Sequence, residues 1–131
     1  MTLSGPTEAT VGTVAAALER RPVVACTHDH DLTPPTIVDA AMQAADDRIA
    51  RARARLLRRD VCVSCGQALT LPTRRTVRPV TVAAAGAPVV TIQLDLPATR
   101  CPSCALDQVP SRSREDLVVV IPALFAAGAR S

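Results

Sequence analysis

Aromatic side chains are almost absent from this sequence, which has one Phe, no Tyr and no Trp in 131 residues. The core must therefore be filled by Ala, Val, Leu and Ile, which bury less area per residue than aromatic rings do. A small domain with such a core usually needs an additional constraint, such as a bound metal, a disulfide or an oligomeric interface. The scarcity of rings also argues against a surface that stacks the bases of single-stranded nucleic acid.

Lysine is also missing, so all 15 basic residues are Arg. Against 12 acidic residues they leave a net charge of +3, which is less basic than most nucleic-acid-binding domains. The total charge therefore excludes little, and the positions of the arginines along the chain matter more.

The sequence lacks any long apolar segment that would direct the chain to a membrane. Residues 1–12 have neither the basic nor the apolar region of a secretory signal. The longest apolar run, Leu117 to Ala129, is shorter than the roughly 20 residues of a membrane span, and Pro122 interrupts it. We therefore expect a cytoplasmic protein with no membrane partner, in which paired cysteines bind metal rather than form disulfides.

The strongest motif is a set of two C-x-x-C pairs, Cys62–Cys65 and Cys101–Cys104. Each pair forms a turn, or knuckle, in which two sulfurs converge, and two knuckles supply the four thiolates that Zn²⁺ prefers in a tetrahedral site. Gly66 follows the first pair and permits the positive φ that such a turn often needs. We predict one Zn²⁺ per chain, bound by Cys62, Cys65, Cys101 and Cys104, with iron as the less favoured metal. Four thiolates leave no position for water or substrate, so we expect no catalytic residues and no enzymatic activity.

Three regions differ in composition. Residues 1–60 are rich in Ala and Arg and predict two helices. Residues 61–109 contain the cysteine pairs and a Val- and Thr-rich segment, which predicts a β-hairpin with arms at residues 76–83 and 89–96. Residues 110–131 begin polar and become an apolar tail with the character of a buried strand and a short helix. The expected fold is α+β: N-terminal helices followed by a small β-hairpin zinc finger with two CxxC knuckles.

The two N-terminal helices are predicted from apolar spacing. The first spans residues 7–20, and the second begins after the Pro34-Pro35 pair and runs almost to Cys62. The apolar face of the first comprises Val11, Val14 and Leu18, and the seam of the second comprises Val38, Met42, Ala45, Ile49, Ala52 and Leu56. The seam has the alternating spacing of a helical hairpin or short coiled coil, so a homodimer is an option.

The cysteine module, residues 62–104, resembles the YgiT-type zinc finger found at the N-terminus of MqsA-like antitoxins. The resemblance rests on CVSCG, on the Val/Thr hairpin with its central Gly86, and on VTIQLDLPATRCPSC. It implies zinc at the four cysteines and a role in gripping a protein partner such as a toxin. In two respects the chain departs from the family: Ala105 replaces the glycine usual after the second pair, and the segment after Cys104 is too short for the family's helix-turn-helix domain.

The segments VCVSCG and DLPATRCPSC are also similar to the knuckles of rubredoxins, which bind one iron and transfer electrons. Rubredoxins pack aromatic residues around the iron, and residues 62–104 contain none. The leading functional prediction is therefore a non-enzymatic, zinc-binding regulatory protein, antitoxin-like, that recognises a protein partner. The alternative is a zinc ribbon that associates with nucleic acid or with the transcription or translation machinery, and a rubredoxin-like electron carrier is the third hypothesis.

Arginines cluster around the first cysteine pair and form a candidate contact site for phosphates or for an acidic partner surface. They are Arg48, Arg51, Arg55, Arg58, Arg59, Arg74, Arg75 and Arg78. The first five fall on one arc of the second predicted helix. A solvated helix face explains them equally well.

A second candidate metal site consists of Cys26, His28 and His30, which alternate and would point to one side of an extended strand. On a straight strand these three residues spread over about 13 Å, too far to surround one ion. A buried cysteine followed by a polar loop is the simpler interpretation.

Overall fold

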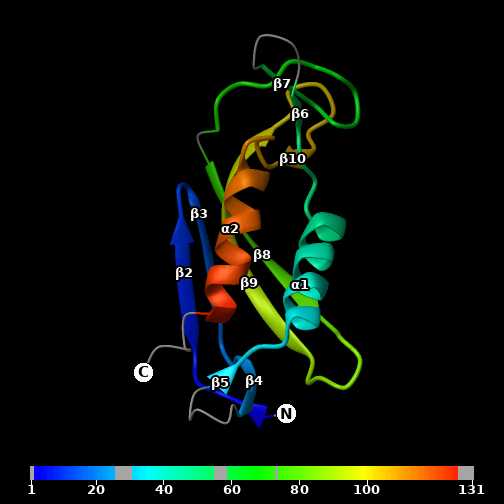
Figure 1. Cartoon of the computed structure of the whole chain (residues 1–131). Coiled ribbons are helices and arrows are strands. Elements are labelled where there is room, and N and C mark those ends of the chain that lie inside the picture. The colour runs from blue at the N-terminus through cyan, green and yellow to red at the C-terminus, as the bar shows by residue number, and fades with distance from the viewer. Residues whose placement is uncertain (1, 26–30, 55–58, 73, 127–131) are drawn as a thin grey trace.

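The computed structural model describes residues 2–25, 31–54, 59–72 and 74–126, and it is mostly β-sheet with two helices (Figure 1). In chain order the elements are β1 (Thr2–Leu3), β2 (Thr7–Val11), β3 (Val14–Leu18), β4 (Pro22–Ala25), β5 (Asp31–Leu32), α1 (Pro35–Arg48), β6 (Arg53–Ala54), β7 (Asp60–Val61), β8 (Arg74–Val82), β9 (Val90–Arg100), β10 (Asp107–Gln108) and α2 (Ser113–Ala126). None of these described helices has the length and apolarity needed to cross a bilayer.

Strand β9 is the centre of the main antiparallel sheet, whose order is β10-β9-β3-β2 with β8 also paired to β9. Residues 92–95 pair with both β3 and β8, so these two strands lie on opposite edges of β9. The predicted hairpin is present as β8 and β9, with arms longer than expected. Gly86, at a φ of 76°, lies in the turn between them. Small sheets β1-β4-β5 and β6-β7 complete the described structure.

The prediction of N-terminal helices followed by a small zinc finger is wrong. Residues predicted as the first helix form the β2–β3 hairpin, which turns at Gly12 with a φ of 58°. Val14, Ala16 and Leu18 are buried on alternate positions and pack in the core, as a strand requires. The spacing of these apolar residues fits both a helix face and a strand. Their strand pairs with β9, which lies far along the chain, and this non-local pairing favours the strand.

The second predicted helix is shorter than its apolar seam. Helix α1 ends at Arg48, and Ile49 has extended backbone angles, φ −106° and ψ 117°. Beyond it the chain pairs with the segment after β10: the Ala52 N–H donates to the Val109 carbonyl and the Val109 N–H donates to the Ala50 carbonyl, both at 2.9 Å. The helix therefore stops where these strand-like hydrogen bonds begin. Leu56, the last residue of the predicted seam, lies outside the described residues.

The apolar tail, predicted as a strand and a short helix, forms the single helix α2. Leu117, Val120, Ile121, Leu124 and Phe125 are buried at the spacing of one helical face, so β-branched residues that favour strands are accommodated by core contacts.

Both helices cover the same face of the sheet (Figure 1). Helix α2 packs on β2 and β3, helix α1 packs on β8, and the helices contact each other. One hydrophobic core therefore contains residues from the N-terminal strands, the hairpin and the C-terminal helix. Strand β9 of this two-layer body ends directly before Cys101, and β7 of the small β6-β7 sheet ends directly before Cys62.

Candidate metal centre

Four cysteine sulfurs meet beyond the end of the main sheet. The Sγ atoms of Cys62, Cys65, Cys101 and Cys104 all lie within 4.8 Å of one another. Two of the separations cross between the knuckles at 3.5 Å each, one from Cys62 to Cys104 and one from Cys65 to Cys101. Sulfurs at the corners of a tetrahedron with Zn–S bonds of about 2.3 Å lie about 3.8 Å apart. The donor set and its spacing therefore fit a tetrahedral metal ion.

The first knuckle is a tight turn that begins with β7. The Cys62 N–H donates to the Gln67 carbonyl at 2.8 Å, and the Gly66 N–H donates to the Cys62 carbonyl at 3.0 Å. Gly66 has a φ of 77°, the conformation for which glycine is favoured. Cys62 is buried and Cys65 is exposed, so that the turn presents one sulfur from inside the protein and one from its surface.

The second knuckle repeats the same hydrogen bonds. The Cys101 N–H donates to the Leu106 carbonyl at 3.0 Å, and the Ala105 N–H donates to the Cys101 carbonyl at 2.9 Å. Ala105 has a φ of 61° at the position equivalent to the glycine of the first knuckle. Cys101 is buried and Cys104 is exposed. The two knuckles are therefore related by an approximate twofold symmetry.

The environment of Cys62 favours its thiolate. Burial raises the pKa of Cys62, but backbone N–H groups of Cys65 and Ser64, with further donors, outweigh it and lower the pKa to about 6. Across the site, the Leu106 N–H lowers the pKa of Cys104, but the neighbouring Cys62 sulfur and burial raise it to about 12. Cys104 thus retains its proton beside a thiolate.

In the other cross-knuckle pair the two pKa values also shift in opposite directions. The Cys104 N–H lowers the pKa of Cys101 against the effect of burial. The Gln67 N–H lowers the pKa of Cys65, but the adjacent Cys101 sulfur and burial raise it overall. Cys65 and Cys104 thus keep their protons more strongly than a free thiol does, and a divalent cation would have to displace both protons to be held by all four sulfurs.

Among the eight arginines predicted as a contact site, those that the structure describes do not all share one face. Three form ion pairs within the protein: Arg51, Arg74 and Arg75 donate to Asp46, Asp107 and Asp95 at 3.3, 3.3 and 2.8 Å, respectively. Along β8, the buried Val80 and Val82 mark the face that packs against the helices, and Arg75 lies on the opposite face beside Asp95. Arg59 is exposed, and Arg55 and Arg58 lie outside the described residues. The second candidate metal site, Cys26, His28 and His30, also lies outside them.

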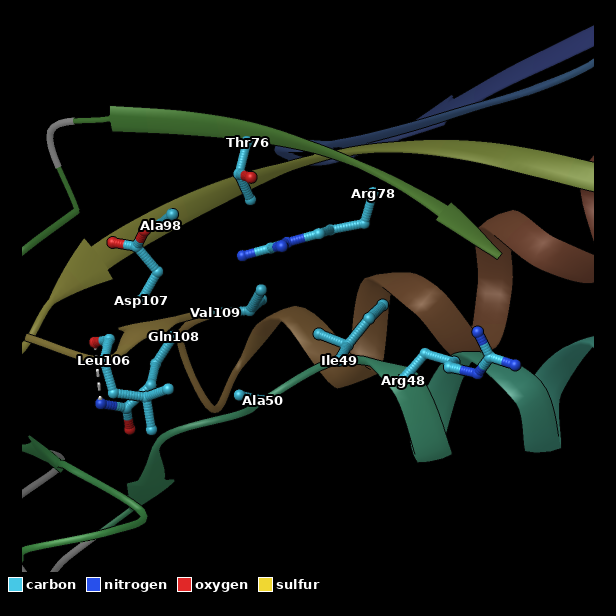
Figure 2. A pocket seen from close by; sticks show the side chains of 10 residues that line it. All are labelled: Arg48, Ile49, Ala50, Thr76, Arg78, Ala98, Leu106, Asp107, Gln108 and Val109. Carbon is cyan, nitrogen blue, oxygen red and sulfur yellow. Dashed lines mark hydrogen bonds between the residues drawn. The ribbon is translucent and has the colours of Figure 1, made fainter. Parts of the chain in front are cut away.

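The remaining two arginines, Arg48 and Arg78, line one pocket of about 210 Å³. This hollow lies between the end of α1 and strands β8, β9 and β10, and Figure 2 shows the Arg78 side chain extended from β8 into it. Gln108 also lines the pocket, and its amide Nε2 donates to the Cys62 sulfur at 3.0 Å. The pocket is therefore adjacent to the cysteine cluster.

Two side chains that hold the knuckles were not predicted from the sequence. Gln108 bonds a cysteine sulfur, as described. Asp60 accepts hydrogen bonds from the Ser111 N–H at 3.1 Å and the Ser111 hydroxyl at 2.6 Å, which ties the first knuckle to the segment before α2. No spacing motif marks either residue. In the sequence, each is marked only as a polar residue next to an apolar residue that flanks a knuckle: Asp60 precedes Val61, and Gln108 precedes Val109.

Comparison with known proteins adds no relative: no family model, no curated protein and no solved structure matches the chain. Function is therefore inferred from the chemistry of the site.

Proposed function

We propose that this chain is a non-enzymatic zinc-binding protein that recognises a protein partner through its knuckle end, as the antitoxins that its cysteine module resembles do. The observation that carries this proposal is the composition of the cluster. Among the described residues its members are four cysteines, with no histidine or carboxylate. A shell of four sulfurs suits a structural ion and leaves no position at which a substrate could bind the metal.

Zinc is preferred over iron as the metal of this site. Tetrahedral four-thiolate coordination suits both ions, but no aromatic side chain lies near the knuckles, because the single Phe, Phe125, is buried in the core from the last turn of α2. Elemental analysis of the purified protein tests the choice. One zinc per chain in a colourless protein supports the proposal, whereas one iron per chain with visible absorbance would favour the rubredoxin-like electron carrier.

Apolar side chains exposed near the knuckles support a protein partner. Val63, between the first two cysteines, is 41% exposed, and Leu71 is 82% exposed. The pocket that Gln108 lines also offers the Arg78 guanidinium to an acidic group of the partner. Apolar side chains and arginine are both enriched at protein interfaces. Because Arg51 and Arg74 pair with carboxylates of the protein itself, a continuous track for phosphates receives less support, and nucleic-acid binding is the alternative.

Affinity capture of the tagged, zinc-loaded protein from its host tests the choice of partner. We expect one stoichiometric protein that survives nuclease treatment and is lost from Leu71→Asp, because a charge would be buried at the interface. Val89→Asp is the matched control. Val89 is also apolar and 64% exposed, but it lies in the turn between β8 and β9, at the other end of the hairpin from the knuckles. The Val89→Asp variant should therefore still capture the partner. Capture that disappears on nuclease treatment and depends on Arg78 would instead support the nucleic-acid alternative.

A further inference from the structure

Gln108 contacts both knuckles with one buried side chain. It belongs to the strand that closes the second knuckle, and it is 2% exposed. Its Nε2 donates to the sulfur of Cys62 at 3.0 Å and more distantly to the carbonyl of Leu106 at 3.4 Å. Its Oε1 accepts the N–H of Val63 at 2.7 Å, which fixes the orientation of the amide. The N–H that points at the sulfur is therefore held in place by the knuckle that it bonds.

The approximate symmetry of the two knuckles shows that this contact has no counterpart. Gln108 pairs with Thr99 in the strands that flank the second knuckle. In the first knuckle the equivalent position is Leu69, whose N–H donates to the Asp60 carbonyl at 3.0 Å. Leucine has no side-chain donor. Among the described residues, Cys62 is thus the one cysteine whose sulfur receives a hydrogen bond from a side-chain amide.

We propose that Gln108 is a positioning residue of the metal centre, which holds the Cys62 sulfur in place, withdraws charge from it and makes it the least reactive of the four ligands. This inference rests on the proposed metal site. An N–H donated to a thiolate is a charge-assisted hydrogen bond, and it stabilises negative charge on the sulfur. Outer-shell partners of this kind typically change metal affinity by about 10- to 100-fold. The backbone of the two knuckles follows one repeated pattern, but the hydrogen bond from Gln108 makes Cys62 different from the other three ligands.

The effect on sulfur charge can be separated from a purely structural role. If Gln108 only satisfies the Val63 N–H and fills space, its replacement changes stability but leaves the electronic state of the metal–sulfur bonds unchanged. If it withdraws charge from Cys62, its loss raises the energy of the sulfur electrons. The thiolate-to-metal charge-transfer band of a cobalt-substituted protein then moves to lower energy.

The experiment uses the full chain loaded with Co²⁺ for spectroscopy and with Zn²⁺ for affinity and alkylation. Gln108→Met removes the donor at nearly constant volume. Gln108→Glu keeps an acceptor for Val63 and replaces the donor by a carboxylate, so it serves if the first variant does not fold. In both we expect a charge-transfer band at lower energy, zinc affinity weaker by about 10- to 100-fold, and iodoacetamide labelling that now includes Cys62. Leu69→Met, at the equivalent position, is the matched control and should leave all three measurements as in the wild type.

Two results would overturn the inference, and they differ in what else they contradict. An unchanged band and unchanged labelling in the Gln108 variants, with a normal four-thiolate spectrum, would show that Gln108 is structural while the metal site stands. A wild-type protein whose cobalt spectrum lacks the four-thiolate band would contradict the metal centre itself.

Discussion

Ala105 is the position at which one substitution should make this protein more stable. It is the one non-glycine residue with positive φ in the described chain, at 61°. A residue with a Cβ in this left-handed conformation costs roughly 1–2 kcal/mol, because the Cβ approaches the following carbonyl. Glycine pays no such cost, and the equivalent position of the first knuckle is Gly66 with a φ of 77°. Ala105→Gly should therefore release strain in the second knuckle.

The expected gain is smaller than the strain, because glycine is also more flexible in the unfolded chain. That flexibility costs roughly 0.5–1 kcal/mol, which leaves a net stabilisation of about 0.5–1 kcal/mol. In a protein of this size such a change raises the midpoint of thermal unfolding by about 3 °C.

Urea unfolding of the zinc-loaded protein, at one fixed zinc concentration for every variant, measures the difference. Gly66→Ala should have the opposite sign, about 1 kcal/mol destabilising. A Cβ at Gly66 would meet no atom within 4 Å, so its cost would be conformational alone. Ala68→Gly, at an exposed residue of the same knuckle without positive φ, should destabilise by roughly 0.5–1 kcal/mol. The reasoning fails if Ala105→Gly lowers stability as much as Ala68→Gly does.

Two further predictions concern protons and a buried charge. Zinc affinity should rise with pH, since the pKa values of Cys65 and Cys104 are raised and both must lose a proton on binding. A chelator competition should give a Kd that falls by about 100-fold per pH unit near neutrality, with a parallel gain in stability, and a pH-independent Kd would contradict the proton assignment. Arg21, 1% exposed, donates to the Phe125 carbonyl in the last turn of α2 at 2.7 Å, so Arg21→Ala should destabilise by about 3 kcal/mol. Arg20→Ala, at the exposed neighbouring residue, should change stability by less than about 0.5 kcal/mol. Similar losses of stability in the two variants would refute the inference that Arg21 caps the C-terminus of α2.

The parts of the site that could be predicted from the sequence are those fixed by local chemistry. Two cysteines separated by two residues must converge if they share a metal, so the knuckles follow from spacing alone. The β8–β9 hairpin follows from alternating Val and Thr on either side of Gly86. In both cases neighbours in the sequence supply most of the contacts, and the pattern therefore suffices.

The parts that could not be predicted depend on contacts between distant residues. The run Ala15-Ala16-Ala17 favours a helix by propensity, but it forms a strand because β9 offers it hydrogen bonds. The apolar seam predicted for the second helix continues past Ile49 to Ala52 and Leu56, but the pairing of residues 50–52 with Val109 ends the helix first. Gln108 was missed for the same reason, since only the folded structure brings it to Cys62.

The pairing of β3 with β9 has a consequence for the order of events during synthesis. Residues 15–18 can find their partners only after residues 92–95 have left the ribosome. Until then the N-terminal hairpin has no sheet to join, and its apolar side chains remain without a core. Contacts of such large sequence separation slow folding, because a long loop must close before they form. The second cysteine pair emerges immediately after β9 and is therefore available for metal at about the time that the sheet can first assemble. Nascent chains that stop before Cys101 should accordingly be bound by chaperones as unfolded protein.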